Sequence, residues 1–141
     1  MKNPGKSIRE AYMTALQGLT YDGKAVQVYE FMPIETLPDN YVYINAITYN
    51  QTGNNQLFIY TAGVAIDIVT KQYKKLDYDV VDGIAEQVQT AILAFPYSQI
   101  QDSNFGFMNT VLESAQYIVE QDGSAFIVRK IIRFTQSLIQ K

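Results

Sequence analysis

The stretch that decides the fold lies near the C-terminal end of the sequence and reads LESAQYIVEQDGSAFIVRKIIRFTQSL (112–138). At its centre, Asp122-Gly123 is a dipeptide typical of two-residue turns, whose twist matches that of antiparallel strands. Apolar and polar residues alternate on either side, as they do in strands. The stretch therefore predicts a β-hairpin of strands 112–121 and 124–138. The expected register pairs Gln121 with Ser124, Val119 with Phe126 and Tyr117 with Val128.

The second strand of this hairpin carries bulky apolar side chains on both faces. Alternation puts Ile127 and Ile131 on one face. A small sheet offers only one face to its own helices, so an apolar second face indicates contact with another subunit. The other face of the strand carries Phe126, Val128, Ile132 and Phe134.

Three more strands are predicted upstream, at 26–29, 41–49 and 57–70, from runs of alternating apolar residues. The segment 50–56 is polar, uncharged and broken by glycine, which indicates a loop between two of these strands. The segment 97–109 has no clear period and is expected to be irregular.

Two amphipathic helices are predicted, at 7–19 and 80–95, where apolar residues recur every three or four positions. Ser7 is the expected N-cap of the first helix, with Glu10 completing a capping box. Asp79 is the expected N-cap of the second. Together these elements predict one α+β domain over residues 1–141. We expect an antiparallel sheet of four or five strands with both helices packed on one face.

The composition excludes several kinds of chemistry. The 141 residues include no Cys and no His, which rules out disulfides, thiolate or imidazole metal ligands, and His-dependent catalytic triads. The net charge of −3 disfavours binding to a phosphate backbone. No secretory signal is visible and no apolar run is long enough to cross a bilayer, so synthesis in the cytosol is the default.

One acidic cluster is the best candidate for a metal site or an acid catalyst. A hard cation needs several oxygen ligands that converge on one point. These acids are irregularly spaced and also suit the start of a helix, where negative charge is favourable, so we expect no metal and no cofactor. The cluster comprises Asp77, Asp79, Asp82 and Glu86.

The order of elements along nearly the whole chain resembles the tail completion, or tail terminator, proteins of tailed bacteriophages. The resemblance rests on element order, length and hydrophobic pattern, because that family has no catalytic motif to match. The segments that carry it are Ile8-Arg9-Glu10-Ala11-Tyr12 with Leu16, Val26-Gln27-Val28-Tyr29 with Pro33, Tyr41-Val42-Tyr43-Ile44, Val64-Ala65-Ile66-Asp67-Ile68-Val69, Val80-Val81-Asp82-Gly83-Ile84-Ala85 and the C-terminal hairpin.

The resemblance implies a structural, non-enzymatic virion protein. Its copies would form a ring, usually of six, that ends the tail tube and joins it to the head connector. Tail tube and connector proteins would be its partners, DNA would pass through without specific binding, and assembly would take place in the host cytoplasm. We expect the contacts between copies at Ile127, Arg129, Ile131 and Arg133 on the last strand, and at Thr52, Gly53, Asn54 and Asn55 in the loop.

Two other functions remain open from the sequence. The first is another neck or ring component of a phage, including a phage with a short tail. The second, of a different class, is a small soluble enzyme, or a ligand- or metal-binding domain, with its acidic site near Asp77 to Asp82.

Overall fold

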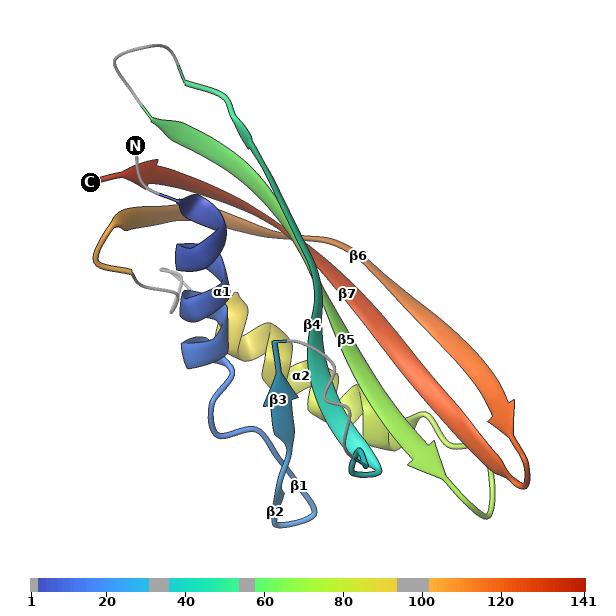
Figure 1. Ribbon diagram of the computed structural model, residues 1–141. Helices are drawn as coiled ribbons and strands as arrows, with labels where there is room; N and C mark the ends of the chain where they lie inside the picture. Colours follow the sequence, from blue (N-terminus) through green and yellow to red (C-terminus); the bar gives the residue numbers. More distant parts are fainter. Residues whose placement is uncertain (1–2, 31–35, 54–57, 94–101) are drawn as a thin grey trace.

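The computed structural model describes residues 3–30, 36–53, 58–93 and 102–141 (Figure 1). A five-stranded sheet with the strand order β3-β4-β5-β7-β6 carries two helices, and a small hairpin, β1-β2, lies beside it. The elements are α1 (Pro4–Ala15), β1 (Thr20–Tyr21), β2 (Lys24–Ala25), β3 (Gln27–Tyr29), β4 (Asn40–Gln51), β5 (Ile59–Gln72), α2 (Asp79–Ile92), β6 (Phe105–Asp122) and β7 (Ala125–Gln140).

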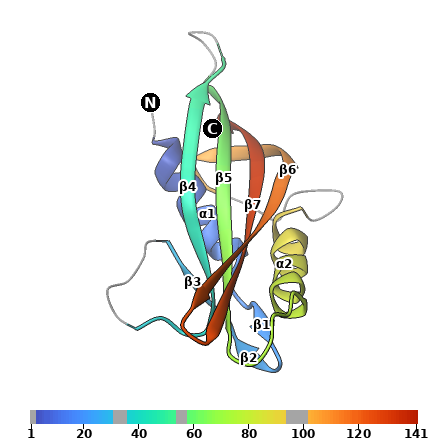
Figure 2. The ribbon, with the colours of Figure 1, turned by 90° about the vertical axis from the view of Figure 1, so that its right-hand side faces the viewer.

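The predicted α+β class is confirmed, and both helices pack on the same face of the sheet. Figure 2 looks onto the sheet from the other side, with α1 behind the strands. The prediction of a wholly antiparallel sheet is wrong for β3, which runs parallel to β4. The pairs β4–β5, β5–β7 and β7–β6 are antiparallel, so the sheet is mixed. No tight hairpin connects β3 to β4, so no turn signal in the sequence indicates the relative direction of the two strands.

The first helix begins earlier than predicted. Its N-cap is Asn3, whose side-chain oxygen accepts hydrogen bonds from the backbone N–H groups of Gly5 and Lys6. Ser7 is buried inside the helix, so the predicted capping box with Glu10 is wrong. Pro4 takes the first helical position, where a missing N–H costs nothing.

The second helix begins one residue before the predicted start. Asp79 is its first residue and Tyr78 its N-cap, so the prediction of Asp79 as the cap is wrong by one position. The Asp77 carboxylate accepts a hydrogen bond from the backbone N–H of Asp79 at 2.8 Å. It therefore satisfies one of the N–H groups left free at the start of the helix. The described helix ends at Ile92, and the predicted end at 95 lies outside the described residues.

The C-terminal hairpin is confirmed, with a register two residues away from the predicted one. Asp122 pairs with Ala125, so Gly123 and Ser124 form the turn, and Val119 pairs with Val128. Gly123 has a φ of 63°, and glycine is the residue that adopts positive φ at the first central position of such a turn. A shift of two residues leaves each side chain on its predicted face. The predicted irregular segment up to 109 is wrong from Phe105 onward, where β6 already begins.

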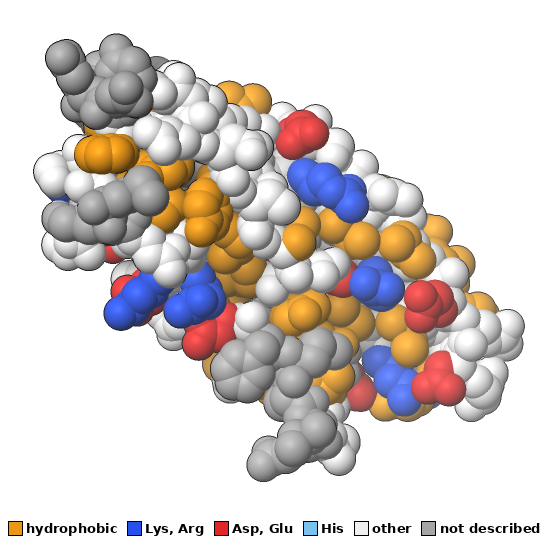
Figure 3. Space-filling view, turned by 45° about the horizontal axis from the view of Figure 1, so that its top comes forward, with side chains coloured by type: hydrophobic (Ala, Val, Ile, Leu, Met, Phe, Trp, Pro, Cys, Tyr) orange, Lys and Arg blue, Asp and Glu red, His pale blue; other side chains and the backbone are white. Residues whose placement is uncertain are grey.

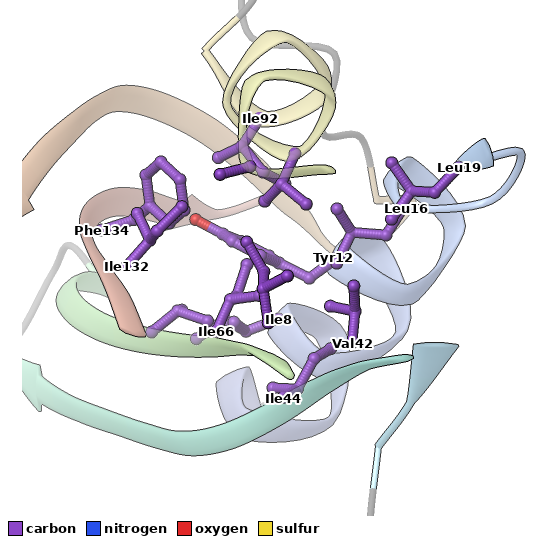
Figure 4. Packing of buried hydrophobic residues seen from close by; sticks show 14 of the residues in the cluster. Ile8, Tyr12, Leu16, Leu19, Val42, Ile44, Ile66, Ile92, Ile132 and Phe134 are labelled. Carbon is purple, nitrogen blue, oxygen red and sulfur yellow. The ribbon is translucent and has the colours of Figure 1, made fainter. Parts of the chain in front are cut away.

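The core lies between the helices and the sheet. Figure 4 shows Tyr12 reaching from α1 towards the strand that bears Ile132 and Phe134. Its hydroxyl donates to the side-chain oxygen of Gln136 at 3.2 Å, and burial raises the pKa of Tyr12 far above its usual value. Thr110 of β6 donates to the same oxygen at 2.6 Å. Other members of the core include Ile8, Leu16, Val42, Ile44, Ile66, Ile68, Val81, Ile84, Val88, Ile92 and Val128.

Candidate assembly surface

The face of the sheet opposite the helices, called here the helix-free face, carries the predicted interface residues of β7. Val128 and Ile132 of this strand point into the core. Alternation therefore turns Ile127, Arg129, Ile131 and Arg133 to the helix-free face. The structure thus brings all four predicted residues of β7 together on one surface.

An ion pair lies at the centre of this face. The guanidinium of Arg129 donates to both carboxylate oxygens of Asp67, whose side chain is only 2% exposed. The hydrogen bonds to Asp67 raise the pKa of Arg129, although partial burial opposes this. Glu120 of β6 lies 3.5 Å from the same guanidinium. The pair is therefore satisfied within one chain, because a buried charge needs such a partner.

Ile131 is 6% exposed, so most of its side chain is covered without a second subunit. Its β5 neighbour Asp67, which is held by Arg129, lies on the same face. The apolar second face of β7 is thus partly explained inside the chain. Arg133 remains at the surface, where no ion pair is formed with it among the described residues.

A hollow of about 570 Å³ opens on the helix-free face. One wall of the hollow is the segment before β4. A hydrogen bond from the Tyr73 hydroxyl to the Asp39 carboxylate, at 2.7 Å, holds this segment in place. That hydrogen bond raises the pKa of Tyr73. Basic and acidic side chains lie next to one another over the surface in view in Figure 3. The lining includes Leu37, Tyr41, Tyr43, Val69, Lys71, Ile127 and Arg129.

The strand β6 is the most exposed long element among the described residues. It is hydrogen-bonded to β7 along one side and forms the edge of the sheet along the other. Nine large hydrophobic side chains are exposed in the described part of the chain, and five of them belong to β6. An edge of this kind is a ready template for pairing with another strand. The five are Met108, Val111, Leu112, Tyr117 and Val119.

The opposite edge of the sheet is also partly open. β3 pairs only with Tyr41, Val42 and Tyr43. The rest of β4, from Ile44 to Gln51, pairs with β5 on one side and has no strand on its outer side among the described residues. Tyr49 on this segment is 44% exposed. No residue of β4 carries a charge.

Asp82 and Asp77, of the acidic cluster near the start of α2, are each held by other contacts. Asp82 accepts hydrogen bonds from Tyr117 at 2.6 Å and from Lys130 at 3.1 Å. Partial burial acts to raise its pKa, but these two donors hold the pKa below its usual value. Asp77 is bonded to the helix start. In the ranges that the structure describes, no three acidic side chains converge on one point.

The predicted loop surface is only partly described. The backbone N–H groups of Thr52 and Gly53 both point to the carbonyl oxygen of Ile59, at 2.7 and 3.3 Å, and close the end of the β4–β5 pair. Asn54 and Asn55 lie outside the described residues. The sequence did not predict the exposed edge of β6 or the open part of β4, although the apolar residues of β6 are visible in it.

Comparison with solved structures finds a similar fold in a chain of a virion particle. No protein-family model and no curated protein match the sequence. The chain is similar to a solved chain described as "Virion of native gene transfer agent (GTA) particle", with a TM-score of 0.64 and 12% sequence identity. The match covers 97% of this chain and 91% of that one. Neither described helix is long and apolar enough to span a membrane. The chain therefore shares the fold of a component of a gene transfer agent particle.

Proposed function

We propose that this chain is a structural virion protein of the tail terminator type. Copies of it form a closed ring, usually of six, at the junction between head and tail. The ring ends the tail tube and joins it to the head connector, so its partners are copies of itself, the tube protein and the connector protein. Its place is the neck of the virion, after assembly in the host cytoplasm.

The observation that supports this proposal best is the shared fold, which extends over 97% of the chain and belongs to a virion particle. A ring needs two different patches on each subunit, because a heterologous contact repeated around an axis closes on itself. The sheet has two such patches, the β6 edge and the open part of β4. The work proposed for the protein is geometric and uses no catalytic group.

Electron microscopy of particles made without the protein tests the proposal. If the ring ends the tube, its loss yields tubes longer than the normal length that are not joined to heads. Tails of normal length would contradict the terminator role and favour another neck component. A strictly monomeric protein that is absent from purified particles would contradict a virion role altogether.

A further inference from the structure

The contact between neighbouring copies can be located more closely, given the ring proposed above. We infer that the free edge of β6 in one copy pairs in antiparallel fashion with the open part of β4, Ile44 to Gln51, in the next copy. The main interface then lies at the two edges of the sheet, whereas the sequence led us to expect it on the helix-free face of β7.

The free edge of β6 is long, and its second half lacks lysine, proline and irregular backbone. Edges in monomeric proteins are blunted by lysine, proline or irregular backbone. β6 has no Lys, Arg or Pro over its 18 residues. Its two register shifts fall in its first half, and from Ala115 to Asp122 it pairs with β7 without a break. This second half therefore presents about eight residues of regular strand to a partner.

Pairing of β6 with β6 of a second copy is disfavoured by charge. The strand carries the acids Glu113, Glu120 and Asp122 and no basic residue. Two such strands side by side would bring six carboxylates together, and the partners within each chain, Arg129 for Glu120 and Lys71 for Asp122, offset only part of that charge. Like charges on paired strands are destabilising. A two-fold dimer would also leave both β4 edges open.

The open edge of β4 has the features that β6 needs in a partner. β4 carries no charge, so it does not repel the acids of β6. After the register shift at Ile44/Ala46, β4 is regular to Gln51, which is close to the length of the regular half of β6. The strand directions also fit, because β4 and β6 run in opposite directions within one sheet. The register through β5 and β7 puts Ile44 of β4 level with Ala115 of β6, and Tyr49 level with Thr110. The regular half of β6 therefore meets the open part of β4 as an antiparallel pair when the two copies are staggered along the strands, as in a closed ring whose strands are inclined to its axis.

Disulfide crosslinking in assembled particles tests this pairing. The chain has no Cys of its own, so no native cysteine can form a competing disulfide. Thr48 of β4 and Gln116 of β6 are exposed and lie on the helix-free side of their strands. The register between copies is sampled by four double variants that combine Thr48→Cys or Asn50→Cys with Ser114→Cys or Gln116→Cys. The single variants are the matched controls, and circular dichroism verifies that each variant folds.

The expected result is a ladder of covalent multiples, up to the full ring, from at least one oxidised double variant, with monomers alone from the single variants. Covalent dimers from the Gln116→Cys single variant would overturn the inference in favour of β6–β6 pairing. Particles that contain the protein but give no ladder from any of the four combinations would overturn the strand pairing and leave the proposed function standing. Ladders from a protein that particles do not incorporate would keep the pairing and contradict the function.

Discussion

β6 and β7 are the two arms of one hairpin and are similar in length, yet their surroundings are opposite. β7 lies between β5 and β6, and most of its side chains are buried or half-buried. β6 has a strand on one side only, and most of its side chains are exposed although several are large and apolar. The difference teaches that position in the sheet, more than apolar content, decides which arm stabilises the chain and which remains available to a partner.

The sharpest test of this contrast uses two residues that face each other across the hairpin. Phe134 of β7 is fully buried, whereas its partner Leu112 of β6 is 39% exposed. Phe134→Ala should lower the free energy of unfolding by about 3–5 kcal/mol, because it removes a large buried side chain and leaves a cavity. Leu112→Ala should lower it by less than about 1 kcal/mol. Urea denaturation of the isolated protein measures both, and equal losses would contradict the contrast.

The ion pair beneath the helix-free face should give the next largest effect. Asp67→Ala leaves Arg129 without its buried partner and should cost about 3 kcal/mol in unfolding free energy. The double variant Asp67→Leu with Arg129→Met removes both charges and should recover most of that loss. Thermal and urea unfolding of the three proteins test this. A double variant no more stable than the single one would show that packing, not charge, holds this part of the sheet.

The smallest expected effect concerns the contact between α2 and the hairpin. Asp82 is bound by Lys130 and Tyr117, which lower its pKa in the folded state, so its contribution to stability is present above the usual value of 3.8 and is lost as the pH falls through the lowered pKa. Since Asp82 is substantially exposed, Asp82→Asn should cost less than about 1 kcal/mol at pH 7.

Melting temperatures between pH 7 and pH 3 give the measurement for Asp82. The difference between wild type and Asp82→Asn should shrink towards the acid end. Asp79→Asn is the matched control, because Asp79 shares the first turn of α2 and the benefit of the helix dipole but makes no ion pair with Lys130. Equal effects of the two substitutions at pH 7 would show that the contact with the hairpin contributes nothing.

Local pattern was enough to predict the class, the order of the two helices and of the strands in the five-stranded sheet, and the face of each that is buried, but not the small hairpin β1-β2. The stripe of α2, with Ile84, Val88 and Ile92, and the alternation of β7 both follow from periodicity, and both are confirmed. The start of β6 was missed because register shifts at Phe107/Thr110 and Leu112/Ser114 break the period of two. The parallel direction of β3 depends on contacts between distant segments, which no local signal encodes.

The candidate surface was predictable in part. Alternation correctly grouped the four β7 residues on one face. The sequence could not show that the charge of Arg129 would be neutralised within the chain by Asp67, which lies 62 positions earlier. The exposure of β6 depends on the strand order, since the same sequence in a central strand would be buried. Whether either surface meets a second copy stays a prediction.

The hydrogen bond between Tyr12 and Gln136 joins residues 124 positions apart and has a consequence for the order of events during synthesis. α1 leaves the ribosome before β7, and this contact forms only once β7 has emerged. Folds dominated by such distant contacts form slowly, on the scale of milliseconds to seconds. A chain without β7 lacks this contact and also the strand with which both β5 and β6 pair. The sheet of the chain is therefore complete only after β7 has left the ribosome.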